Sequence, residues 1–107
     1  GGPSAGLMFA LEIYDQLVEE DLTKGYKVIG TGELDYHGNV KRIGGVDKKV
    51  IAANRADCDI FFVPYENGRE DSNYHEAKRV AESIGTDMEI VPVDTFQEAL
   101  NYLKQLQ

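Results

Sequence analysis

The chain has 107 residues, which is enough for one domain with a buried core. Its 19 acidic residues outnumber its 11 basic residues, giving a net charge of -8 without any basic run that could follow a phosphate backbone. This balance argues against nucleic acids and anionic membrane surfaces as partners. No apolar stretch approaches the roughly 20 residues that cross a bilayer.

The single cysteine, Cys58, excludes a disulfide within the chain. The sequence has no CxxC pair and no His/Cys cluster of the kind that binds zinc, so we expect neither a metal nor an organic cofactor. Cys58 stands between two aspartates just before an apolar run, which predicts a small buried core residue. The cysteine count leaves the cellular compartment open.

The first part of the chain predicts a helix and a hairpin. Apolar residues recur at helical spacing over residues 5–20, so this helix should bury one stripe. The stripe comprises Leu7, Leu11, Tyr14, Leu17 and Val18. Residues 27–34 (KVIGTGEL) predict a strand, and the turn residues at 37–39 predict a hairpin to residues 40–43.

The middle of the chain predicts a helix, a buried strand and a second helix. Two glycines precede a short helix expected over residues 46–56. IFFVP at 60–64 is a continuous apolar run, which is typical of a strand buried on both faces. Asn73 and Glu76 form a predicted capping-box pair for a helix that should end at Gly85.

The last part predicts one more strand and one more helix. MEIVPV at 88–93 reads as a strand that Pro92 places at an edge, and Thr95 with Glu98 caps the final helix. Strands alternate with helices in this half of the chain, as in crossover units. Residues 1–107 are therefore predicted to form a single α/β or α+β domain, a two-layer or three-layer sandwich.

Ser4 stands in a glycine-rich opening segment, GGPSAGL. A helix N-cap is one interpretation, because serine is a preferred cap residue. However, a capping box would need Glu or Gln at position 7, where Leu7 stands. A nucleophile is the other interpretation, since the positive end of a helix favours a developing alkoxide or oxyanion. The backbone N–H groups of Ser4 and Ala5 would then be candidate oxyanion donors.

A phosphate-binding loop is a further alternative for GGPSAG, because helix starts bind anions. The segment lacks the GK[ST] ending of a P-loop.

A serine nucleophile needs a base, and neither histidine is well placed to act as one. His37 falls in the predicted hairpin turn, and His75 lies in the first turn of an exposed helix. A lysine kept neutral by burial is the other base that proteins pair with serine.

Helical geometry separates the two adjacent lysines, Lys48 and Lys49. At about 100 degrees per residue, Lys49 lies about 60 degrees from Val46, at the edge of the buried arc, and Lys48 lies on the far side. The neighbours of Lys49 on this face are small: Ala52, Ala53 and Ala56. The helical wheel thus selects Lys49 as the candidate base. The alternative is that the Lys49 amine extends to solvent and has no catalytic role.

Three motifs taken together resemble the proteolytic domain of Lon peptidases. They are PSAG at 3–6, TGEL at 31–34 followed by GNV at 38–40, and IGGVDKK at 43–49. The resemblance implies a Ser-Lys dyad with Ser4 as nucleophile and Lys49 as base, and it places Thr31 close to the dyad. It implies a serine endopeptidase that cleaves protein or peptide substrates through an acyl-enzyme.

The segments DIFFVP, EDSNYHEA and VPVDTFQEALNYL resemble the PDZ-containing, Lon-like branch of bacterial peptidases. This finer resemblance implies a PDZ domain and a membrane anchor upstream, no ATPase module, and a domain outside the cytoplasm, with a cytoplasmic location as the alternative. Lon-type domains have further strands before PSAG and form hexameric rings. We therefore expect a homo-oligomer, a domain truncated at its N-terminus, and weak cleavage by these residues alone. A catalytically inactive interaction domain is the remaining alternative.

Overall fold

A parallel sheet of three strands lies at the centre of the fold. The computed structural model describes residues 5–107, in which the strand order is β1-β4-β5. The strands are β1 (Val28–Gly30), β4 (Ile60–Pro64) and β5 (Glu89–Val93). In register, Ile60 of β4 lies opposite Val28 on one side and Glu89 on the other. The longest apolar run of the three, IFFVP, therefore occupies the central position.

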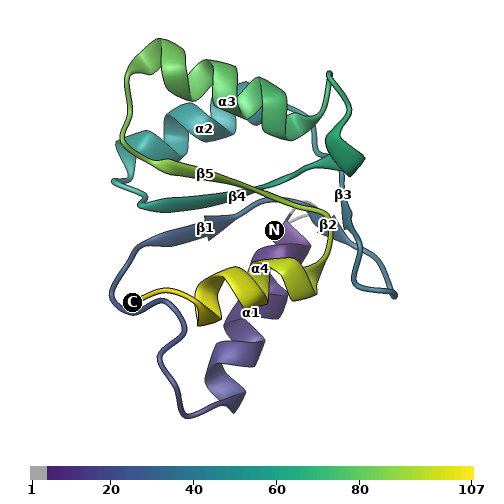
Figure 1. The fold of residues 1–107 in the computed structure, drawn as a ribbon, viewed down its shortest axis with the longest axis vertical. Coiled ribbons are helices and arrows are strands. Elements are labelled where there is room, and N and C mark those ends of the chain that lie inside the picture. Colours follow the sequence, from purple (N-terminus) through teal and green to yellow (C-terminus); the bar gives the residue numbers. More distant parts are fainter. Residues whose placement is uncertain (1–4) are drawn as a thin grey trace.

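Helices cover both faces of this sheet (Figure 1). Helices α1 (Gly6–Leu17) and α4 (Phe96–Lys104) pack on one face, and α2 (Val46–Arg55) and α3 (Asn73–Ile84) pack on the other. The result is a three-layer α/β sandwich, which confirms the predicted fold class. Among residues 5–107, no helix is long and apolar enough to cross a membrane.

Strand β4 divides its side chains between the two cores. Phe62 packs with α1 and α4, whereas Phe61 and Val63 pack with α2 and α3. This alternation follows from the two-residue period of a strand, and every residue of β4 is buried. The prediction of a strand buried on both faces is confirmed. Pro92, which cannot donate a ladder hydrogen bond, lies in the edge strand β5, as predicted.

The segment 27–34, predicted as one strand, forms two strands in different sheets, so that prediction is wrong. β1 ends at Gly30, and β2 (Glu33–Leu34) pairs antiparallel with β3 (Val40–Lys41). The chain turns at Gly32, where φ is +133° and a Cβ atom would overlap Cγ1 of Val40. This break places Thr31 at the C-terminal end of β1.

The hairpin between β2 and β3 is confirmed, and Asp35 organises its turn. The Asp35 carboxylate accepts hydrogen bonds from the backbone N–H groups of Asn39 and His37, and from the side chain of Asn39. These bonds, led by the one from the Asn39 backbone, lower the pKa of Asp35 to about 2. Local polar contacts thus specify the turn.

Helix α1 ends at Leu17 rather than continuing to residue 20, and its buried stripe is narrower than predicted. Leu7 and Leu11 are buried, but Leu17 is 79% exposed. Phe9 and Ile13 lie at four-residue spacing with Leu17 and are exposed as well. Apolar periodicity predicted the helix, but it did not predict how much of its surface the described residues cover.

The cap of α3 is Ser72 and not Asn73, so the predicted capping pair is wrong. The Ser72 hydroxyl accepts a hydrogen bond from the His75 backbone N–H at 3.1 Å. The Asn73 side chain is buried and hydrogen-bonds instead to the backbone of Ile43. The helix ends at Gly85 as predicted, and the capping box of Thr95 with Glu98 is confirmed.

Cys58 is a core residue, as predicted. It is buried, its thiol donates to the Ile60 carbonyl at 3.1 Å, and burial raises its pKa. The Cys58 thiol is therefore chemically unreactive.

We expect Gly32→Ala to lower the free energy of unfolding by about 2 kcal/mol or more, because it adds backbone strain and a clash with Val40. Gly44→Ala is the matched control, since Gly44 has an ordinary φ and open space where a Cβ would stand. Urea unfolding followed by circular dichroism measures both. Equal midpoints for the two variants would contradict this account of the break.

Candidate active site

A cavity beside the C-terminal end of β1 brings the three sequence motifs together. It measures about 420 Å³ and is lined by Ala5, Ile29, Gly30, Thr31, Lys49, Ala52, Ala53, Ala56 and Phe61. PSAG contributes Ala5, TGEL contributes Thr31, and IGGVDKK contributes Lys49. Segments that are far apart in the sequence therefore meet at one place, and most of the remaining lining is small and apolar.

The start of α1 is held against the break between β1 and β2. The Leu7 backbone N–H donates to the Gly32 carbonyl at 3.1 Å. A Cβ on Gly6 would lie 3.0 Å from the Leu34 nitrogen, so the close approach requires glycine at this position. The glycine of PSAG thus brings the helix start to the cavity.

The N-cap of α1 is Ala5, and no side-chain hydrogen bond caps the helix there. Ser4 precedes Ala5 in the sequence, and it lies outside the described residues, as does its backbone N–H. The predictions made for Ser4 therefore stay predictions, and Ala5 is the PSAG residue that the structure places at the cavity.

Thr31 is buried, and both of its donors bind the same acceptor. Its backbone N–H and its hydroxyl each donate to the Phe62 carbonyl, at 3.0 Å in both cases. Because the hydroxyl hydrogen is used in this way, the Thr31 oxygen is left as an acceptor. It is suited to receive a hydrogen bond from an amine in the cavity.

Lys49 lies in the first turn of α2, where its backbone N–H donates to the Gly45 carbonyl at 3.2 Å. Its side chain is half-buried and lines the cavity, whereas Lys48 is exposed and does not. This placement agrees with the helical wheel. Within residues 5–107, no carboxylate forms an ion pair with Lys49.

Neither histidine lies at this cavity. His37 is exposed in the hairpin turn. The Nδ1 atom of His75 lies 2.8 Å from the Ser72 hydroxyl and 2.7 Å from the Arg69 carbonyl oxygen, so it is engaged at the start of α3. Lys49 is therefore the one nitrogen base of the described lining.

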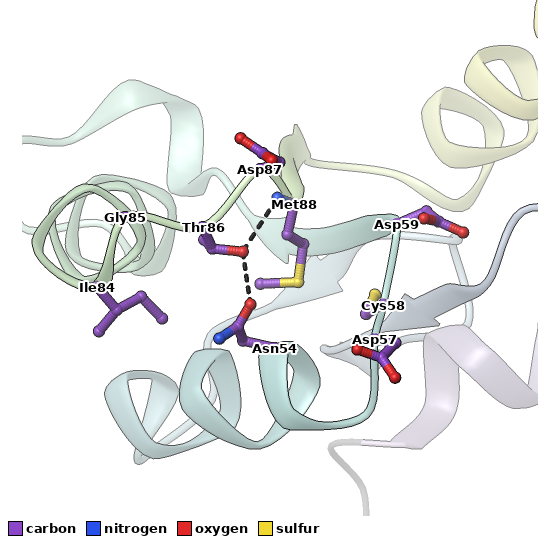
Figure 2. Close-up of a pocket in the computed structure, with 9 residues that line it drawn as sticks. All are labelled: Asn54, Asp57, Cys58, Asp59, Ile84, Gly85, Thr86, Asp87 and Met88. Atoms are coloured by element: carbon purple, nitrogen blue, oxygen red, sulfur yellow. Dashed lines mark hydrogen bonds between the residues drawn. The ribbon is translucent and has the colours of Figure 1, made fainter.

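A second depression of similar volume lies at the N-terminal ends of β4 and β5 (Figure 2). Its wall carries three carboxylates: Asp57, Asp59 and Asp87. Thr86 bridges it, donating to Asn54 at 2.6 Å and accepting from the Met88 N–H at 3.1 Å (Figure 2). In the described part of the chain, no three His, Cys, Asp or Glu side chains, these carboxylates included, are grouped so that they could hold a metal ion. These contacts join α2 to the α3–β5 connection, and none of the three motifs reaches them.

The comparisons with known proteins bear on the cavity formed by the three motifs. Residues 1–105 match the family described as the Lon protease (S16) C-terminal proteolytic domain. The chain belongs to this family. The three motifs that converge on the cavity are those by which the sequence resembles Lon peptidases.

Individual Lon proteases are similar to the chain over most of its length. The chain is 31% identical over 100 residues to the Lon protease of Aster yellows witches'-broom phytoplasma (strain AYWB), and 35% identical over 105 residues to that of Campylobacter jejuni. Each alignment covers 94% of the chain and 12% of the relative. The Lon protease of Methanosarcina barkeri is 31% identical over 99 residues, 92% of the chain and 11% of that protein. The chain thus spans a small part of the length of these relatives.

Proposed function

We propose that the complete gene product containing this chain is a serine endopeptidase in which Ser4 is the nucleophile and Lys49 its base. The observation that carries the proposal is the cavity where Ala5, Thr31 and Lys49 meet, in a chain of the Lon proteolytic family. Protein or peptide substrates follow from the same family membership.

The reaction uses the amine of Lys49 twice. The neutral amine takes the proton of the Ser4 hydroxyl, whose oxygen attacks the carbonyl carbon of the scissile peptide bond. The tetrahedral oxyanion is stabilised by backbone N–H groups, for which Ser4 and Ala5 are the candidates. Collapse breaks the C–N bond, and the Lys49 ammonium gives its proton to the leaving amine. Water, deprotonated by Lys49, then hydrolyses the acyl-enzyme and restores Ser4.

Thr31 has a positioning role in this mechanism. Its oxygen can accept one N–H of the Lys49 amine, because its own hydrogen is bound to the Phe62 carbonyl. Such a bond would fix the amine so that its lone pair faces the serine. No carboxylate of residues 5–107 forms an ion pair with Lys49, so no such contact competes with the bond to Thr31.

We expect Ser4→Ala and Lys49→Ala each to lower kcat by about 1,000-fold or more, because either change removes a group that acts in bond making. Lys48→Ala is the matched control, since it removes the adjacent, exposed lysine. Peptide hydrolysis by the complete gene product measures the effect, and circular dichroism verifies the fold. If Lys48→Ala were inactive and Lys49→Ala active, the base would be Lys48 and not Lys49.

Two alternatives predict a different result with a serine-reactive probe. An inactive interaction domain or an anion-binding loop would leave Ser4 unlabelled in the complete gene product, whereas the proposed dyad makes it the labelled residue. Mass spectrometry identifies the site of labelling.

The cavity favours an apolar substrate side chain next to the cleaved bond, since its floor is built from Ile29, Phe61 and alanines. We expect Ala52→Leu, which fills part of this space, to reduce kcat/KM for peptides with Leu or Phe before the cleaved bond by about tenfold, and to change it far less for peptides with Ala there. Arg55→Leu adds a leucine to the same helix away from the cavity and is the control. Equal losses of kcat/KM for peptides with large and with small side chains would show that this cavity does not bind the substrate side chain.

We further propose that the complete gene product works without ATP, forms a homo-oligomeric ring, and is held by a membrane anchor with this domain outside the cytoplasm, beside a PDZ domain. The support is the resemblance of DIFFVP, EDSNYHEA and VPVDTFQEALNYL to the PDZ-containing, Lon-like branch. We expect equal rates of peptide hydrolysis with and without ATP, a multimer by light scattering, and recovery in the membrane fraction. A rate that depends on nucleotide would place the protein with ATP-driven peptidases instead.

A further inference from the structure

Asn73 is a buried polar residue whose side chain binds the backbone of a distant segment. It is 1% exposed and is the first residue of α3. Its carboxamide oxygen accepts from the Ile43 N–H at 2.8 Å, and its NH₂ group donates to the Ile43 carbonyl at 3.1 Å. The side chain thus satisfies both backbone groups of one residue, as a neighbouring strand would. An amide carries its acceptor and its donor on two separate atoms, so it can bind both backbone groups of one residue, whereas a hydroxyl has a single oxygen for both roles.

Glu66 adds a second link between the same two segments. Its carboxylate accepts from the Asn73 backbone N–H and from Nη1 of Arg42, the latter at 2.9 Å. Its side chain is only 10% exposed, and the hydrogen bond from Arg42 raises the pKa of that guanidinium. Residues 42 and 43 are therefore held by the β4–α3 connection through both a charged and a neutral contact.

The backbone around Glu66 is strained, which indicates that these contacts are strong enough to maintain it. Glu66 and Asn67 both have positive φ values, 52° and 55°, and Gly68 follows at 83°. Left-handed geometry is unfavourable at residues other than glycine, less so at asparagine, and at Glu66 it persists only where the surroundings impose it. The bonds from Arg42 and Asn73 to the Glu66 carboxylate meet this requirement.

Ile43 is the last firmly held residue before the helix that carries Lys49. Gly44 and Gly45 follow it, both exposed, and a Cβ on either would have no neighbour within 4 Å. Gly45 then accepts the Lys49 backbone N–H as the first bond of α2. The apolar contacts of α2 on the sheet side hold the helix but are not directional. The two bonds to Ile43 are directional.

We propose that Asn73 is a positioning residue for the active site, which fixes the first turn of α2, and with it the amine of Lys49, by binding both backbone groups of Ile43. The inference rests on the proposed function in that Lys49 is taken as the base. A displacement of about 1 Å at a reacting group can cost about 100-fold in rate, so a loosened helix start lowers kcat without removing any group that touches the substrate.

The test compares Asn73→Ala with Ser72→Ala in the complete gene product. Both variants remove a hydrogen-bonding side chain at the start of α3, but only Asn73 contacts Ile43. We expect Asn73→Ala to lower kcat about tenfold or more with KM changed less than about twofold, and Ser72→Ala to leave kcat within about twofold. Hydrogen exchange of residues 43–49 should be faster in Asn73→Ala alone. A folded Asn73→Ala variant that matches Ser72→Ala in kcat and in exchange would overturn the proposal.

Two further comparisons cover the cases in which Asn73→Ala does not fold or the unchanged gene product is inactive. If Asn73→Ala does not fold, Asn73→Asp replaces it, because the aspartate retains the acceptor for the Ile43 N–H and loses the donor to the Ile43 carbonyl; the same two readouts then apply. If the unchanged gene product hydrolyses no peptide, the proposed function fails. Hydrogen exchange then decides by itself whether Asn73 holds the start of α2: faster exchange in Asn73→Ala alone supports that role, and equal exchange overturns it.

Discussion

The carbonyl of Phe62, on the central strand, accepts two hydrogen bonds from Thr31, and the geometry of the candidate site depends on this arrangement. The bonds end β1 at a defined residue and turn the chain at Gly32, whose own carbonyl then receives the Leu7 N–H from α1. One short backbone segment therefore connects the sheet to the start of the first helix. Each unmade bond of this kind, if its groups stayed buried, would cost about 1–3 kcal/mol.

The same segment also determines which hydrogen-bonding group Thr31 presents to the cavity. A hydroxyl whose hydrogen is donated to a backbone carbonyl can only accept further hydrogen bonds. Thr31 therefore lines the cavity as an acceptor for an amine. The amine that the fold supplies is Lys49, bordered by alanines and without a carboxylate partner among residues 5–107. The cavity combines a lysine with an apolar wall, and the proposed serine–lysine mechanism rests on this combination.

The segment before α2 is held in a different way. Asn73 and Glu66 bind residues 42 and 43 through polar contacts, while α2 itself packs through apolar contacts with the sheet and α3. Polar bonds specify a position, and apolar burial supplies most of the stabilisation. The GG dipeptide between them has open space around it, so the register of α2 is set by residues on both sides of the glycines.

Much of the candidate site was predictable from the sequence, because its signals are local. The helical wheel separated Lys49 from Lys48 within one turn. The resemblance of the three motifs to Lon peptidases pointed to Lys49 and Thr31. Continuous hydrophobicity predicted the buried strand β4, and short-range caps predicted the start of α4 and the end of α3. Each of these features depends on residues a few positions apart.

Two of the errors share a physical cause, which is competition from residues outside the local segment. KVIGTGEL has the composition of a single strand, but Thr31 is bound by Phe62 and Gly32 is crowded by Val40, so the segment divides between two sheets. Asn73 has the chemistry of a cap, but Ile43, 30 residues away, binds its side chain, and Ser72 takes the cap position. The sequence by itself determined most of the helices and strands, a class of α/β or α+β, and the family. Only the tertiary structure decided which motif residues share a cavity and which polar side chains hold them there, because those outcomes depend on contacts that local periodicity does not encode.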